Sequence, residues 1–376
     1  MSRYLKILEI SSCFPPSRGG VERCVYELST RFAKLGHDVT VATSTRGKRA
    51  EPHAEEMDGI RVFRFPERYH IFEAPLIPKV ALTALTQDYD LLHVHGMSPT
   101  ITDLSIIFAS MRGKPVVLTY HNDAESHSWG PIARLAAFAY ASLVSFVIRR
   151  ASVVVSSTQS YADTSVALKL SLKKVRVIPM GVDSSKYENS EHSISDVATR
   201  NLLFVGQLKE YKGVNVLLDA ISIINSSGNK VNLTIVGTGP ELENLKRKSR
   251  TLGIEGSTRF LGNVSDKELL RLYSTCDSVV LPSLNRREAF GIVLLEAMAA
   301  GKNVVASDIP GVNEIAAKGG GFLAKPNDAR SLANSIMNSL SKKDRFAVVR
   351  KVAQDHSWDK LAAKYETIFH ELIGAD

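Results

Sequence analysis

Short apolar runs alternate with segments of helical periodicity along almost the whole chain. Apolar residues recur at helical spacing between the runs, as in Val214, Leu217, Leu218 and Ile221. Strands that are apolar on both faces and alternate with helices are typical of parallel sheets covered on each side. The sequence therefore predicts an α/β protein with two Rossmann-like sheets. The runs that predict strands are YLKILEI, DVTVATS, IRVFRF, LLHVHG, PVVLTY, SVVVSS and VRVIPM in the first half, and NLLFVGQ, VNLTIVG, STRFLG, SVVLPS, NVVASD and GGFLAK in the second.

The length of the chain and one polar stretch predict two domains. At 376 residues the chain exceeds the size at which a single core usually stops growing. The stretch GVDSSKYENSEHSISDVATRN is rich in Ser, Asn and Asp and nearly free of apolar residues, so we place a linker at 183–200. It separates an N-terminal domain, 1–182, from a C-terminal domain, 201–356. We expect the final amphipathic helix, 357–376, to pack back on the first domain.

Composition narrows the class of protein. The chain is 44% hydrophobic and 23% charged, as is usual for a globular protein. Its three cysteines, Cys13, Cys24 and Cys276, include no C-x-x-C pair, which argues against a disulfide framework or a cysteine zinc site. No apolar segment is long enough to cross a bilayer, and the N-terminus enters a strand without a signal-peptide pattern. We therefore expect a cytoplasmic protein.

Positive charge is concentrated in the first half, where residues 1–180 carry 22 Lys and Arg against 16 Asp and Glu. Such a surface suits nucleic acid, an anionic membrane or phosphorylated small molecules, or it serves solubility alone. Basic and aromatic residues are not interleaved and no zinc spacing is present, so we expect no nucleic-acid partner. The segment PIARLAAFAYASLVSFVIRR, 131–150, has two interpretations: a buried helix, or a helix that contacts the inner face of the cell membrane.

The segment NRREAFGIVLLEAMAAG places two glutamates, Glu288 and Glu296, around a predicted helix start. If the helix begins near Gly291, the free amides of Gly291, Ile292 and Val293 can hold a phosphate while the Glu288 carboxylate holds sugar hydroxyls. Glu296 lies in an apolar run, where a carboxylate is costly unless it is hydrogen-bonded, for instance to a ribose diol. The alternative is a helix-capping glutamate followed by a second, surface glutamate.

These motifs, taken in order, resemble the retaining glycosyltransferases of the GT-B fold, glycosyltransferase family 4. The resemblance covers nearly the whole chain, and it implies two Rossmann-like domains that face each other across a cleft, with parallel sheets. It also implies that the C-terminal domain binds a nucleotide sugar and the N-terminal domain the acceptor. The segments that carry the resemblance are GGVER, LLHVHG, TYHND, VIPMGVD, FVGQLKEYKG, LTIVGTGPE, FLGNVSDKELLRLYSTCD, PSLNRREAFGIVLLEAMAAG and VVASDIPGVNEI.

The resemblance implies roles for individual residues. The glycine turn after the first strand meets the donor diphosphate, Lys212 neutralises that diphosphate, and His121 approaches the donor sugar. The family usually has an arginine where this chain has Gln207, so Lys209 or Arg286 would have to supply the missing charge. The catalytic residues implied are Glu288, Lys212 and His121, and the donor-binding residues are Gly19, Gly20, Gln207, Lys212, Gly237, Gly262, Asn263, Glu288, Phe290, Gly291, Ile292 and Glu296.

Three patterns with other meanings are set aside. The D-x-D of Asp88 and Asp90 precedes a strand, so it predicts a turn rather than a metal site. VGTGPE lacks the third glycine of a dinucleotide-binding motif. His93 and His95 share one face of a strand, which is half of a metal site, yet no third ligand is apparent; we interpret them as structural or acceptor-side residues and predict no metal.

The sequence thus predicts a metal-independent enzyme that needs no cofactor and moves a sugar from a UDP- or GDP-sugar to the hydroxyl of a sugar or lipid-linked acceptor. Glycan, glycolipid or polysaccharide biosynthesis is the expected setting. Two alternatives remain open at this point. One is a nucleotide-sugar epimerase of the same fold. The other, suggested by Gln207, is a relative that binds nucleotide sugars without catalysis.

Overall fold

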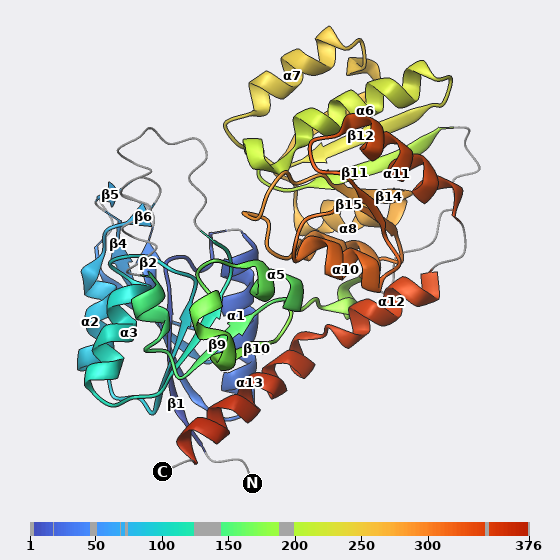
Figure 1. The fold of residues 1–376 in the computed structure, drawn as a ribbon. Coiled ribbons are helices and arrows are strands. Elements are labelled where there is room, and N and C mark those ends of the chain that lie inside the picture. Colours follow the sequence, from blue (N-terminus) through green and yellow to red (C-terminus); the bar gives the residue numbers. More distant parts are fainter. Residues whose placement is uncertain are drawn as a thin grey trace. The chain divides into compact units, whose positions relative to one another are not determined.

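The computed structural model divides the chain into two compact units (Figure 1). The first unit is formed by Met1–Met180 and Trp358–Asp376, and the second by Gly181–Ser357. The chain therefore leaves the first unit once and returns to it with its last helix. The structure describes residues 4–17, 19–45, 51–67, 69–71, 74–123, 144–187, 199–342 and 346–374.

The first unit is built on an eight-stranded sheet with the order β10-β9-β8-β7-β1-β2-β4-β3. All neighbouring strands in it run parallel except β3, which is antiparallel to β4. A separate two-stranded sheet pairs β5 with β6. The strands are β1 (Lys6–Ser11), β2 (Asp38–Thr45), β3 (His53–Met57), β4 (Ile60–Pro66), β5 (His70–Ile71), β6 (Ala74–Pro75), β7 (Leu91–His95), β8 (Val116–Tyr120), β9 (Val153–Ser156) and β10 (Val175–Val177).

Strands β1, β7, β8 and β9 are buried almost throughout, because helices cover both faces of a parallel sheet. The helices of this unit are α1 (Gly20–Lys34), α2 (Pro78–Thr86), α3 (Thr102–Met111), α5 (Gln159–Thr164), the 3₁₀ helix η1 (Lys169–Lys174) and α13 (Trp358–Ile373).

Helix α13 completes the core of the first unit. Its residues Trp358, Tyr365 and Phe369 are buried. The Phe369 ring centroid lies 5.1 Å from that of Phe32 on α1. At the edge of this contact, Arg31 Nε donates to Asp359 Oδ1 at 2.7 Å. The apolar face of the last helix thus fills space that residues 1–180 leave open.

The second unit contains a six-stranded, fully parallel sheet with the order β13-β12-β11-β14-β15-β16. Its strands are β11 (Arg200–Val205), β12 (Val231–Val236), β13 (Thr258–Gly262), β14 (Ser278–Leu281), β15 (Asn303–Ser307) and β16 (Phe322–Ala324). Its helices are η2 (Ser184–Tyr187), η3 (Glu210–Lys212), α6 (Val214–Ser226), α7 (Leu242–Thr251), η4 (Glu255–Ser257), α8 (Asp266–Thr275), α9 (Ile292–Ala299), α10 (Val312–Lys318), α11 (Ala329–Ser341) and α12 (Phe346–Asp355).

Each apolar run that the sequence analysis interpreted as a strand forms one, and the prediction of an α/β fold with two parallel sheets is confirmed. Strands β3, β5 and β6 were not predicted. Most of the segment 131–150 lies outside the described residues; its end, 144–148, is helical, with Val144, Val147 and Ile148 buried. Among the helices that the structure describes, none has the length and apolarity needed to cross a membrane.

Candidate active site

The carboxyl ends of the parallel strands of the second unit gather most of the predicted donor-binding residues. Gln207 follows β11, Gly237 follows β12, and Gly262 ends β13 with Asn263 directly after it. The loop after β14 carries Glu288 to the start of α9. Parallel strands bring their carboxyl ends to one edge of the sheet, which is where ligands bind in folds of this type.

Two of these loops pack backbone against backbone. Gly237 N donates to the carbonyl oxygen of Gly262 at 2.8 Å, and Leu208 N donates to that of Thr238 at 2.9 Å. Gly237 has a φ of 133°, and a Cβ on it would overlap the carbonyl oxygen of Gly206. The glycines of VGTGPE therefore allow two loops to approach closely, which is a reason for them that the sequence alone did not supply.

We expect Gly237→Ala to destabilise the second unit by roughly 3 kcal/mol or more, because the clash is with backbone and no side-chain rotation relieves it. Gly228→Ala is the matched control. Gly228 also has a positive φ, 88°, but a Cβ there would meet nothing within 4 Å. The Gly228→Ala substitution should lower the free energy of unfolding by only about 1 kcal/mol. Urea unfolding of both variants measures the difference, and equal losses would contradict the clash.

Lys212 and Glu288 form an ion pair beside the start of α9. Lys212 Nζ donates to Glu288 Oε2, which also accepts from Ser283 Oγ at 3.3 Å. The two side chains are only 15% and 12% exposed. Burial by itself would lower the pKa of the lysine, but the Glu288 carboxylate outweighs it and the pKa is raised. Lys212 is therefore a cation at neutral pH.

Glu288 keeps one oxygen available. Its Oε1 has no hydrogen bond from any residue that the structure describes, and it is not among the fully buried unpaired atoms. A carboxylate oxygen held in place by its neighbour and open on one side can accept a hydrogen bond from a ligand hydroxyl.

Helix α9 starts where the sequence predicts. Gly291 is its N-cap with a φ of 77°, and the helix runs from Ile292. The first amides of any α-helix lack partners inside the helix, so those of Ile292 and Val293 are free for an anion. Phe290, another predicted contact, is 3% exposed. The geometry thus places a free-amide turn directly after Glu288.

Glu296 is inside α9 and 5% exposed, so the alternative of a surface glutamate is wrong. Its Oε2 accepts a hydrogen bond from Tyr273 Oη at 2.7 Å. Burial and the neighbouring carboxylate raise the pKa of Tyr273 well above its ordinary value, which keeps the phenol a donor. Tyr273 was not predicted as a site residue, although its hydroxyl on an amphipathic helix is a plausible partner for a buried carboxylate.

Two cations contact the ring of Tyr211. The guanidinium of Arg287 lies 4.8 Å from the ring centroid of Tyr211, and Lys212 Nζ lies 5.4 Å from the same centroid. Lys209 and Arg286 were the predicted substitutes for the arginine replaced by Gln207, and Arg287 was not predicted. Lys212 and Arg287 share the Tyr211 ring as a neighbour.

In the first unit, the glycine turn leads into α1 as predicted. Gly20 is the first residue of the helix and Gly19 its N-cap, in an extended conformation. A Cβ on Gly19 would overlap the carboxyl group of Glu22. An acidic side chain thus lies against the start of α1, where the peptide dipoles favour negative charge.

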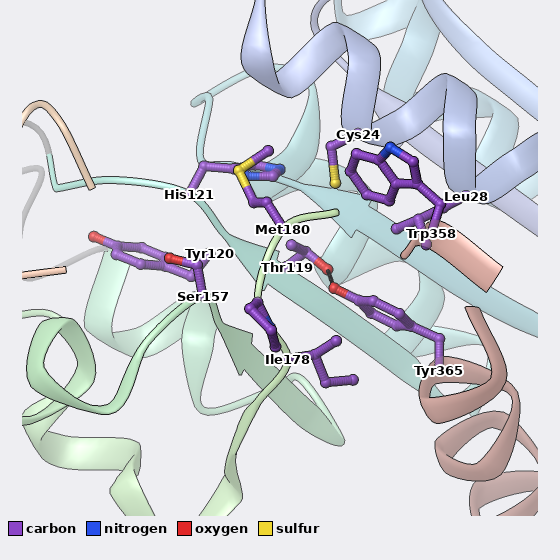
Figure 2. Close-up of a pocket in the computed structure, with 11 residues that line it drawn as sticks. Cys24, Leu28, Thr119, Tyr120, His121, Ser157, Ile178, Met180, Trp358 and Tyr365 are labelled. Atoms are coloured by element: carbon purple, nitrogen blue, oxygen red, sulfur yellow. Dashed lines mark hydrogen bonds between the residues drawn. The ribbon is translucent and has the colours of Figure 1, made fainter. Parts of the chain in front are cut away.

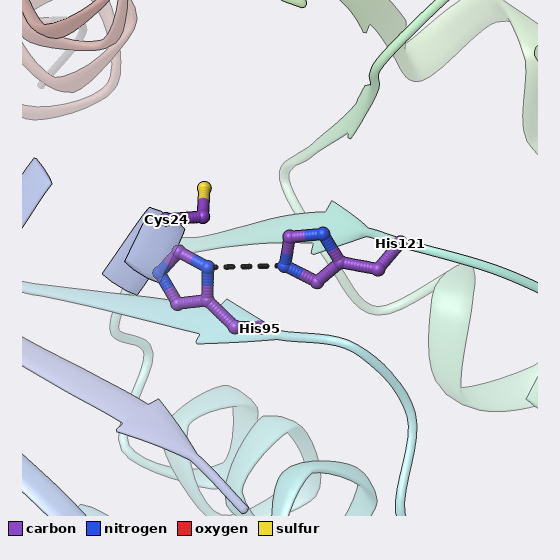
Figure 3. Close-up of side chains that lie close together, drawn as sticks. All are labelled: Cys24, His95 and His121. Atoms are coloured by element: carbon purple, nitrogen blue, oxygen red, sulfur yellow. Dashed lines mark hydrogen bonds between the residues drawn. The ribbon is translucent and has the colours of Figure 1, made fainter. Parts of the chain in front are cut away.

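His121 follows β8 and is buried, and it lines a small pocket (Figure 2). Its Nε2 lies 3.4 Å from Nδ1 of His95 on β7, and the two rings are nearly parallel (Figure 3). Burial, reinforced by His95 and His93, holds the pKa of His121 well below its ordinary value. The imidazole is therefore neutral at physiological pH.

Behind His121 lies a carboxylate that the sequence analysis overlooked. Glu9 on β1 is fully buried; its Oε1 is 3.0 Å from His93 Nδ1 and its Oε2 is 2.9 Å from His95 Nε2. Burial alone would raise the pKa of Glu9, yet the two histidines lower it to about 2. Burial lowers the pKa of His95 to about 4. Glu9 could have been singled out from the sequence, because it is the single acidic residue of the apolar run YLKILEI.

We expect the first unit to lose stability on acidification. His95 is neutral when folded but protonates near pH 6.5 when unfolded, so stability falls as the pH drops from about 6.5 toward 4; the lowered pKa corresponds to roughly 3 kcal/mol. Glu9 protonates near pH 4.5 when unfolded and near 2 when folded, so further stability is lost below pH 4.5. Urea midpoints measured from pH 8 to 3 test this. A flat profile down to pH 4.5 would contradict it, and His95→Gln should weaken the first loss.

Three groups of side chains in the described residues have metal-ligand chemistry. In the first group, Glu9 already has a hydrogen bond to each of His93 and His95. In the group His37, Glu366 and His370, the Nδ1 of His37 accepts from Leu5 N at 3.3 Å, so the proton of the neutral ring is on Nε2 and no lone pair is left there for a metal. In the third group, Cys24 approaches His95 and His121, but burial raises the pKa of its thiol, which disfavours the thiolate a metal requires.

One of the two α/β units has a buried cation–carboxylate pair beside a free helix N-terminus, and such an arrangement can hold an anionic, hydroxyl-bearing ligand. Comparison with known proteins makes this specific. The family described as "Glycosyl transferases group 1" matches residues 186–356, and "Glycosyltransferase Family 4" matches residues 18–186. Together the two matches cover most of the chain.

Individual relatives agree with the family matches. D-rhamnosyltransferase WbpZ of Pseudomonas aeruginosa is 30% identical over 308 residues, which is 77% of this chain and 74% of that protein. GDP-mannose:cellobiosyl-diphosphopolyprenol alpha-mannosyltransferase of Komagataeibacter xylinus is 24% identical over 98% of this chain and 94% of its own length. Sucrose-phosphate synthase from Thermosynechococcus elongatus shares the fold, with a TM-score of 0.79 at 21% identity and full coverage of both chains.

The chain therefore belongs to glycosyltransferase family 4, the retaining glycosyltransferases of the GT-B fold. It is an enzyme that takes a sugar from a nucleotide-sugar donor. The expectations of fold, family and enzyme class drawn from the sequence are confirmed.

Proposed function

We propose that this enzyme transfers a hexose from a UDP- or GDP-linked donor to a hydroxyl of a lipid-linked glycan, without a metal ion. The observation that carries the proposal is the buried Lys212–Glu288 pair beside the free amides of α9. A cation, a carboxylate with one open oxygen and a helix N-terminus together match the three parts of a sugar diphosphate: its charge, its hydroxyls and its phosphate oxygens.

In the proposed reaction the bond between the anomeric carbon and the diphosphate oxygen breaks on the face where the acceptor oxygen bonds. The proton of the acceptor hydroxyl goes to the departing diphosphate. Lys212 neutralises charge that grows on the diphosphate, and the amides of Ile292 and Val293 add fixed dipoles. Glu288 holds hydroxyls of the donor sugar. Positioning of this kind lowers the activation barrier, because the entropy of orienting the reactants is lost on binding and not in the transition state.

The remaining predicted residues would serve recognition of the donor. Glu296, held by Tyr273, would accept from the ribose hydroxyls. The backbone around Gly262 and Asn263, braced by Gly237, would border the base, and Gln207 would donate to the diphosphate. Arg287, which contacts the same Tyr211 ring as Lys212, would supply the charge that an arginine provides in other members of the family.

Two features support a lipid-linked acceptor at the inner face of the cell membrane. The first half of the chain is basic, as suits an anionic lipid surface. Phe146 is 42% exposed, and Arg150 lies 3.7 Å from its ring centroid, so an apolar ring and a cation lie together on one surface. The relative from Komagataeibacter xylinus is named for a diphosphopolyprenol acceptor. Activity on anionic vesicles that falls as salt rises would support this, and equal activity on a water-soluble acceptor would contradict it.

A second candidate function is nucleotide-sugar binding without turnover, which Gln207 favours because a glutamine brings no charge. It predicts donor binding by calorimetry, no transfer, and activity that appears in Gln207→Arg. Turnover by the unchanged protein excludes it.

The proposal is tested with a panel of UDP-, GDP-, ADP- and dTDP-sugars, following nucleotide release with and without EDTA, beside Glu288→Ala. We expect release from one UDP- or GDP-sugar, unaffected by EDTA and lost in the variant. Loss of release on adding EDTA, or normal release by Glu288→Ala, would contradict the proposal. Product analysis by NMR without acceptor would reveal an epimerase.

A further inference from the structure

Side chains from three adjacent strands form a continuous chain of hydrogen bonds inside the first unit. Glu9 on β1 is opposite His93 on β7 in the sheet register, and His95 on β7 is opposite Thr119 on β8. His121 comes two residues after Thr119. The chain runs from Glu9 through His95 to His121 in one direction, and through His93 and Thr119 to Tyr365 in the other.

The protons along the first arm can be placed by elimination. An ionised carboxylate only accepts, so the 2.9 Å contact between Glu9 Oε2 and His95 Nε2 requires a proton on that nitrogen. The neutral His95 ring then has a lone pair on Nδ1. The 3.4 Å contact with His121 consequently requires the proton of His121 to be on Nε2. The remaining nitrogen of His121, Nδ1, is left as an acceptor.

The surroundings of His121 contain other polar groups that lack partners. Nδ1 of His121 has no hydrogen bond from any described residue. Ser157 and Trp358 line the same pocket (Figure 2), and Ser157 Oγ and Trp358 Nε1 are buried and unpaired in the described part of the chain. Buried polar groups are normally satisfied, so a pocket with several unpaired ones indicates a place for a hydroxyl group or a water molecule.

We propose that Glu9 and His95 are positioning residues that hold His121 in one tautomer, with the proton on Nε2 and a lone pair on Nδ1, so that the ring accepts a hydrogen bond from a sugar hydroxyl but cannot donate one. This rests on the proposed function only for the identity of the ligand, a sugar substrate. The arrangement distinguishes ligands: a group that offers a proton at this point is bound, and one that offers only a lone pair, such as a keto or O-methyl oxygen, is not.

The tautomers can be measured in the unchanged protein. Two-bond ¹H–¹⁵N correlation spectra of full-length enzyme labelled in its histidines distinguish a protonated Nε2 from a protonated Nδ1. We expect neutral Nε2–H patterns for both His95 and His121 at pH 7. A proton on Nδ1 of either ring would overturn the inference, whatever the activity of the enzyme.

Variants then test whether Glu9 fixes the tautomers of His95 and His121. In Glu9→Gln the amide can accept or donate, so His95 and His121 should show mixed tautomers. Outer partners of metal-bound histidines contribute about 10–100-fold to activity, and we expect a loss of the same order here, in kcat with little change in the donor KM. Tyr365→Phe is the matched control, since it removes an equally buried hydrogen bond at the opposite end of the chain. It should leave the His121 pattern intact.

The outcomes separate this inference from the proposed function. Unchanged tautomers and unchanged kcat in Glu9→Gln would overturn the positioning role while the donor panel still supports transfer. An inactive wild-type enzyme would instead count against the proposed function and leave the tautomer result standing. If one equivalent of Zn²⁺ removed the Nε2–H signal of His121 and EDTA restored it, Cys24, His95 and His121 would be a metal site and the inference would be wrong. Glu9→Gln need not fold for the wild-type spectrum to decide.

Discussion

Transfer activity should fall about a thousandfold in Lys212→Met, because in the proposed mechanism this lysine neutralises the departing diphosphate. The same change leaves the Glu288 carboxylate in a largely buried place without its partner. Removal of one member of a buried ion pair costs about 3–5 kcal/mol, and the slight exposure of this pair puts the loss at the lower end. Both kcat/KM and the urea midpoint should therefore drop.

A double variant separates the two effects. Lys212→Met combined with Glu288→Gln has no unpaired charge, so we expect its stability to recover while its activity stays lost. Lys248→Ala is the control, because it breaks a similar ion pair with Asp219, at 2.6 Å, elsewhere in the second unit. It should transfer normally. If the double variant regained activity together with stability, Lys212 would be a structural residue and its proposed role in transfer would be wrong.

Removal of Trp358–Asp376 should leave the first unit unfolded. The deleted helix buries several large apolar side chains, including Trp358, Leu361, Tyr365, Ile368 and Phe369. Their burial contributes roughly 10 kcal/mol, which is comparable with the whole stability of a typical domain. The second unit contains none of these residues and should keep its cooperative unfolding transition. Urea unfolding followed by circular dichroism would then show one transition where the full chain shows both.

Lys364→Ala is the control for the deletion. Lys364 lies on the exposed face of α13, so its truncation should change the unfolding free energy by less than about 0.5 kcal/mol. A truncated protein that kept both transitions would mean that residues 1–180 form a complete core, contrary to the packing of Phe369 on Phe32.

The fold could be predicted from the sequence wherever a strand is buried on both faces, because such a strand is apolar at nearly every position. Runs such as LLHVHG and SVVVSS become β7 and β9, buried along their length. Strand β3, HAEEM, gave no signal. It is at the edge of the sheet and mostly exposed, so its residues need not be apolar, and it forms only through its antiparallel pairing with β4.

Part of the candidate site could likewise be predicted from the sequence, and part could not. Glu288 and the start of α9 could be placed because a helix start has local rules. The contact of Glu288 with Lys212 joins residues 76 positions apart and depends on the order of strands in the sheet, which periodicity does not report. Glu9 was missed for a different reason. Its partners His93 and His95 are 84 and 86 positions away. The role of a carboxylate within an apolar strand cannot be inferred before the fold shows which residues lie beside it.

The return of the chain to its first unit also sets the order in which a new molecule can be built. Residues 1–180 leave the ribosome first, but the helix that completes their core is synthesised only after the whole second unit. The second unit is contiguous, so it can fold while translation continues. The first unit must wait with the apolar face around Phe32 uncovered until α13 has been synthesised. A chaperone that shields this face on the nascent chain would therefore raise the yield of active enzyme, and slow translation of the α13 codons would lower it.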